Sequence, residues 1–501
     1  MDNFSMLFAA VGGLLTMQNM GALILGATLG FVIGALPGLG CIAGVSLLLP
    51  ITFSMNPVTG MAMLASLYYA TMYGGAFSAI LLNIPGDAPA VMTSLDGYPM
   101  AKNGRPGAAL FASIIASCIG GTIGIFILTT VGPVLAHWGL KFGPTEMAAL
   151  MLLALSSIGW LMGDSPVKGI ITAMLGLMLG MIGLDIAGIP RYDFGVMHLL
   201  GGLPFGAVGI GLFGFSQVLG MIEDRGKEME TEVDASNLTL KNSLPNKDEL
   251  KRLLPPALRS SILGTFIGIL PGAGATASAF LGYTMQKFFK SKQPMGMGAV
   301  EGVAAAEAAN NSACAGAFAP LLALGVPGSA VTAILLSALM VWGLKPGPLL
   351  FTNSPEFAWS TIATLFIANI ITLIVAIVSI PFIIKILKVP TKYMIPGVSF
   401  ICIIGAYAIS NSMYGIIVML FAGLVGYLLN KFNYPLSPLL LAFVLSELFE
   451  QNLRKALMIS QGSVGIFFSR PISLVIMLII FTMIFNPLIR KGIALLRRNK
   501  A

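Results

Sequence analysis

Charged residues are scarce in this chain of 501 residues. They make up 10% of the sequence, whereas 56% of the residues are hydrophobic and the mean hydropathy is +0.91. A soluble domain carries about 25% charged residues, so this composition excludes an ordinary soluble protein. We predict an all-α polytopic membrane protein with about ten to fourteen membrane elements, at roughly 20 apolar residues for each crossing.

The residues and motifs of enzyme active sites are also rare. The chain has two histidines, and it lacks the metalloprotease motif HExxH, the hydrolase motif GxSG and the phosphate-binding loop GxxxxGK[ST]. We therefore expect no enzyme activity, no ATP-driven transport and no cofactor. Four cysteines lie apart in apolar segments without CxxC spacing, which indicates neither a disulfide framework nor a zinc site: Cys41, Cys118, Cys314 and Cys402.

Lys and Arg do not occur between residues 1 and 101. The net charge of +8 falls instead in loops and at the C-terminus. The positive-inside rule explains this distribution without nucleic acid as a partner, and it places the C-terminal tail in the cytoplasm. No basic segment precedes the first apolar residues, so we predict no cleavable signal peptide.

One polar segment interrupts the apolar pattern. Residues 222–259 contain seven Lys/Arg and eight Asp/Glu, which is typical of a solvated connector. We predict that it is a cytoplasmic linker between a first transmembrane half, 1–221, and a second half, 260–501.

The chain contains an internal repeat. Residues 29–40 (LGFVIGALPGLG) and 263–274 (LGTFIGILPGAG) are identical at eight of twelve positions. Two further motif pairs follow in the same order, which predicts repeat units of about 21–111 and about 260–351. Each copy has Pro-Gly within an apolar stretch, and paired breaks of this kind point to the binding site of a transporter. The further pairs are Gly75-Ala76-Phe77…Ile84-Pro85-Gly86 with Gly316-Ala317-Phe318…Val326-Pro327-Gly328, and Arg105-Pro106-Gly107 with Lys345-Pro346-Gly347.

The charges beside the second copy predict a re-entrant hairpin. Arg259 and Lys287 are separated by 27 residues with Pro271-Gly272 near the middle, whereas two full crossings need about 40 residues. We therefore expect two half-length legs whose tip lies inside the bilayer. The first hairpin, about 21–55, has no basic flanks and is expected to open to the other side. The prediction is a pair of inverted structural repeats with re-entrant hairpins and broken helices.

The hairpin tips are candidate substrate-binding elements. Glycine permits close approach of the backbone to a ligand, and helix N-termini present unpaired N–H groups to anions. Close helix packing is the alternative reading. Since no group of Lys or Arg accompanies the tips, a substrate carboxylate would be held by N–H groups, hydroxyls and amides. The predicted residues are Pro37, Gly38, Gly40, Pro271, Gly272, Gly274, Thr276 and Ser278.

Asp87 is a candidate ligand for a coupling cation or a carrier of a coupling proton. An ionisable group in a largely uncharged membrane segment is by default functional. The alternative is that residues 83–105 form a surface loop in which Asp87 and Asp96 cap helices, and for Asp96 we favour that alternative. Asn83 is grouped with Asp87 as a cation ligand. The predicted gating residues at the two breaks are Pro85, Gly86, Pro327, Gly328 and Ser329.

Glu307, Asn310 and Asn311 lie three or four residues apart and share one face of a predicted helix. Their oxygens suit Na⁺, and an Asn pair within an alanine-rich helix is costly unless it binds something or forms hydrogen bonds to another helix. We predict that these three residues contribute to the cation site.

Six motifs resemble those of the large membrane subunit of the tripartite tricarboxylate transporters, the TctA type. The resemblance extends over essentially the whole chain. The matching stretches are GALPGLG, LLLP at 47–50, NIPGDAPAVMTSLDGYPMAKNGRPG at 83–107, EGVAAAEAANNSA at 301–313, LGVPGSA at 324–330 and GLKPGP at 343–348.

This resemblance implies a bacterial inner-membrane permease of the elevator type. Its partners would be a small four-helix membrane subunit, a periplasmic solute-binding protein, a carboxylate substrate such as citrate, and membrane lipid. Uptake of di- or tricarboxylates would be coupled to Na⁺ or H⁺. The alternatives are a transporter of another organic anion and an anion channel, although two tips entering from opposite faces suit gating better than a continuous pore.

Overall fold

The computed structural model describes residues 3–36, 39–157, 166–185, 187–223, 233, 238–239, 243–272, 274–387 and 391–483. Within these ranges the chain is almost entirely helical, and the strands form one short antiparallel pair. Six helical segments of the described part are long and apolar enough to cross a membrane, which confirms an integral membrane protein. They are Met17–Ala35, Pro106–Gly139, Phe205–Glu223, Pro355–Phe382, Lys392–Ser410 and Met413–Lys431.

The two copies of the repeat have the same order of helices: a hairpin, a central helix, a short helix and a long helix. The first copy contains α2 (Met17–Ala35), α3 (Gly40–Thr52), α4 (Pro57–Leu82), α5 (Ala90–Lys102) and α6 (Pro106–Gly139). The second contains α12 (Lys247–Ile269), α13 (Gly274–Gln286), α14 (Val300–Leu324), α15 (Ala330–Val341), α16 (Leu350–Asn353) and α17 (Pro355–Ser379).

Glycines show that the repeat is structural. A Cβ on Gly30 of α2 would collide with the carbonyl oxygen of Leu67 on α4, and a Cβ on Gly264 of α12 would collide with that of Ala309 on α14. The two hairpin glycines are 234 residues apart in the sequence, and their partners Leu67 and Ala309 in the central helices are 242 residues apart. Each central helix therefore packs against its hairpin at a distance that only glycine permits.

The structure changes the register of one motif match. A Cβ on Gly74 would collide with the Phe31 carbonyl oxygen, and a Cβ on Gly316 with the Thr265 carbonyl oxygen. Because Phe31 and Thr265 correspond in the repeat, Gly316 corresponds to Gly74. The sequence match of Gly75 to Gly316 was wrong by one residue. It aligned identical residues, whereas the equivalent positions are those that make the same contact with the hairpin.

The legs of the hairpins are unequal. The second legs, α3 and α13, each have 13 residues, whereas α2 has 19 and α12 has 23. At about 1.5 Å per residue, α2 and α12 are near the length of a full crossing. The expectation of half-length legs therefore holds for α3 and α13 and is wrong for α2, which is long and apolar enough to cross a membrane, whereas α12 reaches its length by including residues 247–259 of the polar segment.

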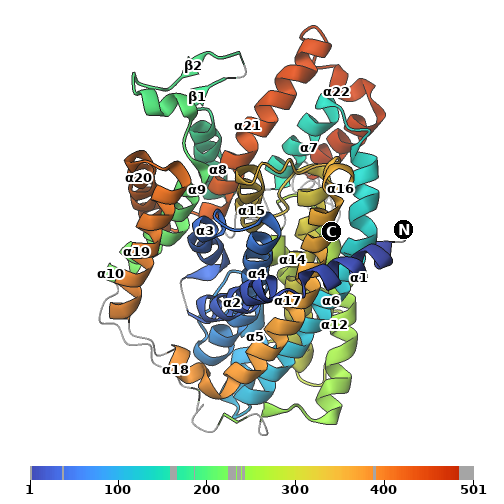
Figure 1. Cartoon of the computed structure of the whole chain (residues 1–501). Coiled ribbons are helices and arrows are strands. Elements are labelled where there is room, and N and C mark those ends of the chain that lie inside the picture. The colour runs from blue at the N-terminus through green and yellow to red at the C-terminus, as the bar shows by residue number, and fades with distance from the viewer. Residues whose placement is uncertain are drawn as a thin grey trace, which may run out of the picture.

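The copies exchange their long helices. Helix α6 of the first copy packs along α14 and α12 of the second, and α17 of the second packs along α4 and α2 of the first (Figure 1). Helix α5 contacts both α4 and α14. The helices α2–α6 and α12–α17 thus form one interlocked body, which we call the core unit.

The helices of residues 144–223 and 391–469 form an outer unit that contacts the core mainly through α3 and α15. Figure 1 shows its strands at the top of the view and α18 (Ile383–Leu387), which follows α17 and η4 (Ile380–Phe382), near the bottom. Helix α1 (Asn3–Leu14) lies against α17. The outer unit contains α7 (Pro144–Ser157), α8 (Pro166–Gly180), β1 (Gly183–Leu184), β2 (Pro190–Arg191), η2 (Met197–Gly201), α9 (Phe205–Gly209), the π-helix η3 (Ile210–Phe215), α10 (Ser216–Glu223), α19 (Thr391–Ser410), α20 (Met413–Lys431), α21 (Leu436–Ile459) and α22 (Ile466–Ser469).

The polar segment 222–259 ends inside a helix. Asn246 caps α12 by accepting a hydrogen bond from the Glu249 N–H at 2.8 Å, and Glu249 Oε2 accepts one from the Asn246 N–H at 3.0 Å. Residues 247–259 therefore belong to the first leg of the second hairpin. Most of residues 224–242 and the whole C-terminal tail after residue 483 lie outside the described residues.

Candidate functional site

The first Pro-Gly break faces a cavity of about 290 Å³, which we call the tip cavity. Four of the predicted site residues line it: Gly40 on α3, and Pro85, Gly86 and Asp87 in the break. The outer unit supplies the opposite wall, and none of the described lining residues is Lys or Arg. The polar and aromatic side chains of that wall are Phe213, Gln217, Asn430 and Ser437.

Asp87 places its carboxylate at the N-terminus of α3. Asp87 Oδ2 accepts a hydrogen bond from the Cys41 N–H at 3.2 Å, and Oδ1 accepts one from the Ala88 N–H at 2.8 Å. The first turn of a helix leaves N–H groups unpaired and favours negative charge. Asp87 thus joins the first break to the first tip, as predicted residues of one site would. Pro37 and Gly38 of that tip lie outside the described residues.

The second break makes the corresponding contact with the second tip. The Gly272 N–H donates to the Gly328 carbonyl oxygen at 3.1 Å. Gly274 begins α13 with φ +63°, the same value that Gly40 has at the start of α3. Ser329, which corresponds to Asp87, instead caps its own helix α15 by accepting from the Thr332 N–H at 3.2 Å.

The two breaks differ in exposure. Residues 326–330 of the second break are all buried, together with Pro271 and Gly272 at its tip. Of residues 83–88 in the first break, only Gly86 is buried. The structure is therefore open at the first break and closed at the second.

Three other predicted residues have positions that sequence did not define. Asn83 is exposed and ends α4 with φ 57°, the position that Gly325 holds at the end of α14 with φ 71°. Ser278 donates to the carbonyl oxygens of Gly274 at 3.1 Å and Gly264 at 3.4 Å, so it joins the two legs of its hairpin. Thr276 is partly exposed on α13.

Glu307 lies in a separate polar pocket of the core. Its side chain is fully buried on α14. The Thr93 hydroxyl of α5 donates to Glu307 Oε1, and the Ser117 hydroxyl of α6 donates to Oε2 at 2.8 Å. Asn311 Nδ2 donates to the backbone carbonyl oxygen of Glu307 at 3.1 Å rather than to its carboxylate.

The central helices bury oxygen atoms that have no hydrogen-bond partner among the described residues. They are Asn310 Oδ1 and Asn311 Oδ1 on α14, and Tyr69 Oη on α4. Tyr69 and Asn311 correspond in the repeat, so both copies bury an unpaired oxygen at the same position. An unsatisfied buried polar group costs about 1–3 kcal/mol, and a bound ligand would offset that cost.

Asp96 is not the cap of a surface loop, so that alternative is wrong. Residues 90–102 form α5, and the Asp96 side chain is fully buried. Asp96 Oδ2 accepts from the Tyr283 hydroxyl at 2.8 Å, and Oδ1 accepts from the N–H groups of Gly296, Gly298 and Ala299 at 2.8–2.9 Å. The polar residues of this segment suggested a surface loop. Asp96 is nevertheless buried, because residues of the second copy of the repeat donate hydrogen bonds to it.

Sequence reasoning missed several site residues, among them Ser117 and the outer-unit wall of the tip cavity. It also missed Asn369, which joins three helices of the core. Asn369 Oδ1 accepts from the Tyr73 hydroxyl at 2.7 Å, and its Nδ2 donates to the Cys118 carbonyl oxygen at 3.0 Å. An Asn within the apolar span 355–382 was the available signal for this residue.

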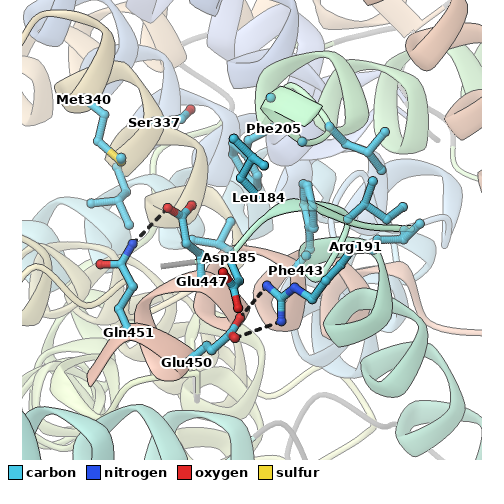
Figure 2. A pocket seen from close by; sticks show the side chains of 18 of the residues that line it. Leu184, Asp185, Arg191, Phe205, Ser337, Met340, Phe443, Glu447, Glu450 and Gln451 are labelled. Atoms are coloured by element: carbon cyan, nitrogen blue, oxygen red, sulfur yellow. Dashed lines mark hydrogen bonds and ion pairs between the residues drawn. The ribbon is translucent and has the colours of Figure 1, made fainter. Parts of the chain in front are cut away.

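A second cavity, of about 430 Å³, lies between α15 of the core and the β1–β2 hairpin, α8 and α21 of the outer unit. Figure 2 shows Ser337 and Met340 on one side, and Arg191 directed toward Glu450 on another. Arg191 donates two hydrogen bonds to Glu450, at 2.8 and 2.9 Å. These bonds raise the pKa of Arg191, so its positive charge is fixed at any physiological pH. We call this space the hairpin cavity.

Hydrogen bonds also fix the charge of Asp185 beside the hairpin cavity. The Ile189 and Ala187 N–H groups, together with Arg454 at 3.1 Å, hold the pKa of Asp185 below its usual range. In the described part of the chain, no group of three or more His, Cys, Asp or Glu is arranged to hold a metal ion. The ion pairs of Arg191 with Glu450 and of Asp185 with Arg454 tie the β1–β2 hairpin to α21.

A helical membrane body, an internal repeat and two matched breaks that meet the hairpin tips define an integral membrane protein of the transporter class. Residues 20–441 match the model of the tripartite tricarboxylate transporter TctA family. The chain belongs to this family, which confirms the resemblance seen in its motifs.

Two relatives from Agrobacterium vitis support the assignment. The chain is 36% identical over 475 residues to an uncharacterized 52.8 kDa protein in the TAR-I ttuC' 3' region, a match that covers 94% of each chain. It is also 36% identical over 211 residues to an uncharacterized protein in the TAR-II ttuC' 3' region, covering 42% of this chain and 87% of the relative. No solved structure matches the chain significantly.

Proposed function

We propose that this chain is the large permease subunit of a binding-protein-dependent secondary transporter. It takes up citrate-like di- or tricarboxylates across the bacterial inner membrane by cation symport with alternating access. Membership of the TctA family supports the permease role. A small four-helix membrane subunit and a periplasmic solute-binding protein are its proposed partners.

The unequal state of the two breaks carries this proposal. The glycine of each break, Gly86 or Gly328, packs against the corresponding carbonyl oxygen of its hairpin, yet the first break is open to a cavity and the second is buried. Two equivalent gates in opposite states are what alternating access requires. We propose that the copies are inverted repeats, so that their gates face opposite sides of the membrane.

The contact between the units supports an elevator-type movement. The core touches the outer unit mainly along α3 and α15. Helix α21 contributes Ser437 to the tip cavity and residues between Phe443 and Gln451 to the hairpin cavity. The two spaces are therefore about 9–21 Å apart along its axis, at 1.5 Å per residue. In the proposal, the core slides past the outer unit and opens the two cavities in turn.

The tip cavity is the proposed substrate site. Its neutral donors, Gln217, Asn430 and Ser437, can bind carboxylate oxygens without Lys or Arg, while Asp87 occupies the N-terminus of α3 on the opposite wall. The polar wall belongs to the outer unit and the helix N-terminus to the core. A substrate between them would therefore be released when the units move apart.

Uptake of labelled citrate tests the proposal, in cells that express the permease with its two partners and in cells that lack each component in turn. Uptake that requires all three supports it. Counterflow in membrane vesicles without a net gradient separates a transporter from an anion channel, because a channel gives no counterflow. Accumulation of a different organic anion in place of citrate would retain the mechanism and correct the substrate.

A further inference from the structure

Glu307 is a buried acid that has no basic partner among the described residues. Its side chain is fully buried in the first third of α14. The ion pairs of the described residues lie at the ends of the helices and in the hairpin cavity, and none of them includes Glu307. An isolated carboxylate in an apolar interior is so costly that it takes up a proton or a cation. The hydrogen-bond partners of Glu307 indicate whether a proton or a cation neutralises it.

The partners of Glu307 suit a proton. Both of its oxygens are held by hydroxyl groups, Thr93 from α5 and Ser117 from α6. A hydroxyl donates and accepts hydrogen bonds, so it can donate to the carboxylate and, after rotation, accept from the protonated acid. The pocket therefore satisfies both protonation states without moving a helix.

The same pocket does not suit a sodium ion. A cation needs several oxygen lone pairs that converge on it, whereas Thr93 and Ser117 contact different oxygens of the carboxylate, Oε1 and Oε2. Asn311 turns its amide N–H toward the backbone of Glu307, and the unpaired oxygens of Asn310 and Asn311 are separate from the carboxylate hydrogen bonds. Among the described residues, no hydrogen bond joins the Glu307 carboxylate to the side chain of Asn310 or Asn311.

Among the described residues, the basic side chains of α5 and α12 are exposed or engaged elsewhere. Lys102, Lys247 and Lys251 are exposed, and Arg252 pairs with Glu301. Arg259 donates to Gln286 at 2.9 Å and lies over the Phe289 ring. Helices α15 and α16 contain no titratable residue. The titratable groups nearest to Glu307 on the packed helices are Tyr73 on α4, Cys118 on α6 and Cys314 on α14, with Asp96 on α5 and its partner Tyr283 on α13 one turn beyond Thr93.

We propose that Glu307 carries the coupling proton of this permease. The proposal rests on the proposed function as a symporter and assigns one of its coupling ions. A proton from the outer side binds the Glu307 carboxylate, and the neutral acid moves with the loaded core. On the inner side the O–H bond breaks, the proton passes to water and the carboxylate is restored, so one proton crosses for each cycle of Glu307.

Difference infrared spectroscopy of the purified permease tests this assignment without any substrate. We expect the carbonyl stretch of a protonated carboxylic acid to appear as the pH is lowered and to be missing from Glu307→Gln. Glu301→Gln, two turns earlier on α14, is the matched control because Glu301 pairs with Arg252 at 3.1 Å. A band that persists unchanged in Glu307→Gln would overturn the proposal.

Transport of a carboxylate gives the second readout. Wild-type uptake is expected to collapse with a protonophore, while Glu307→Gln retains counterflow and loses uphill accumulation. Uptake that requires Na⁺ and ignores the pH gradient would refute the proton assignment but leave the transporter assignment intact. If no tested carboxylate is transported, the proposed function fails, and the infrared measurement still decides the role of Glu307.

The Thr93 hydroxyl provides a test that does not remove the acid. Thr93→Val keeps the shape of the side chain and removes one hydrogen bond to the carboxylate, which is worth about 1.5–3 kcal/mol. We expect the pH profile of uptake to move upward by roughly one to two pH units and to be restored in Thr93→Ser. An unchanged profile in Thr93→Val would show that a merely structural contact had been lost.

Discussion

Gly86 and Gly328 hold the same position in the two copies of the repeat, each pressed against the hairpin that it closes. A Cβ on Gly86 would collide with the Gly34 carbonyl oxygen, and a Cβ on Gly328 would lie 3.0 Å from the Gly268 carbonyl oxygen. Gly34 and Gly268 correspond at the offset of 234 residues. An added Cβ therefore has less room at Gly86 than at Gly328, although the residues of the first break are the more exposed.

Gly86→Ala is therefore expected to inactivate the permease and to lower its thermal stability. The added methyl group meets backbone atoms, which cannot move aside as a flexible side chain does, and overpacking of this kind costs about 1–3 kcal/mol. Thermal unfolding of the purified protein in detergent and uptake in cells measure the two effects. We expect a smaller loss for Gly328→Ala, whose contacts are longer.

Gly21→Ala is the matched control for these substitutions. Gly21 lies in α2 and a Cβ there would meet nothing within 4 Å, so the substitution should be neutral or slightly stabilising because alanine favours a helix. If Gly86→Ala were as stable and active as Gly21→Ala, the close contact between break and hairpin would have no role in function.

The part of the site that sequence could predict is the part made by glycine and proline. Repeated Pro-Gly letters located both hairpins and both breaks, because few other residues adopt those backbone conformations. The partners of Glu307 were not predictable, since Thr93 and Ser117 are 214 and 190 residues away along the chain. The outer wall of the tip cavity was missed for the same reason, because Gln217 and Asn430 reach the site only through the packing of two units.

Asn310→Ala is expected to lower cation-dependent uptake without loss of stability. Asn310 Oδ1 is buried and has no hydrogen-bond partner among the described residues, so its removal relieves a desolvation cost of about 1–3 kcal/mol. A group that is kept at the expense of stability is typical of a ligand site. Thermal unfolding and uptake at several Na⁺ concentrations measure the two effects.

Asn369→Ala is the contrasting variant, because the Asn369 amide is paired on both sides by Tyr73, Cys118 and Thr122. Its loss leaves buried partners unsatisfied and should lower stability by about 1–3 kcal/mol. An Asn310→Ala protein that unfolds as early as Asn369→Ala would show that Asn310 is structural.

Asp87→Asn is expected to weaken cation-dependent uptake while leaving membrane insertion intact. The change removes a negative charge from the N-terminus of α3, where a carboxylate contributes about 0.3–1 kcal/mol, so we expect a loss of up to roughly fivefold. Dose–response curves for Na⁺ and for pH, measured on the same cells, identify the affected ion. Asp248→Asn, in an exposed ion pair with Lys292 at 3.0 Å, is the control and should transport normally. Unchanged Na⁺ and pH dependence in Asp87→Asn would remove Asp87 from the coupling site.

Glu450→Gln is expected to loosen the β1–β2 hairpin, whereas Glu447→Gln, one turn away in the same cavity, should not. Glu450 accepts both hydrogen bonds from Arg191 and one from Arg454 at 2.8 Å, while among the described residues the partner of Glu447 is Gln451 at 3.0 Å (Figure 2). A hydrogen bond to a charged group contributes about 1.5–3 kcal/mol, so limited proteolysis within 183–191 should be at least roughly tenfold faster in Glu450→Gln. Equal cleavage of the two variants would show that the hairpin is held by its apolar contacts.

The hairpin should also keep its protection when the medium is acidified from pH 7 to pH 5. Because the folded structure holds the pKa of Asp185 below its usual range, the ionised side chain stabilises the hairpin at every pH above the usual aspartate value of about 4. That contribution is lost only as the pH falls through the lowered pKa. Proteolysis at pH 7 and pH 5, with an enzyme active at both, should therefore give equal rates, and Asp185→Asn should be cleaved faster at both. A wild-type rate that rises between pH 7 and pH 5 would mean that Asp185 is protonated there, contrary to its hydrogen bonds with Ile189 and Ala187.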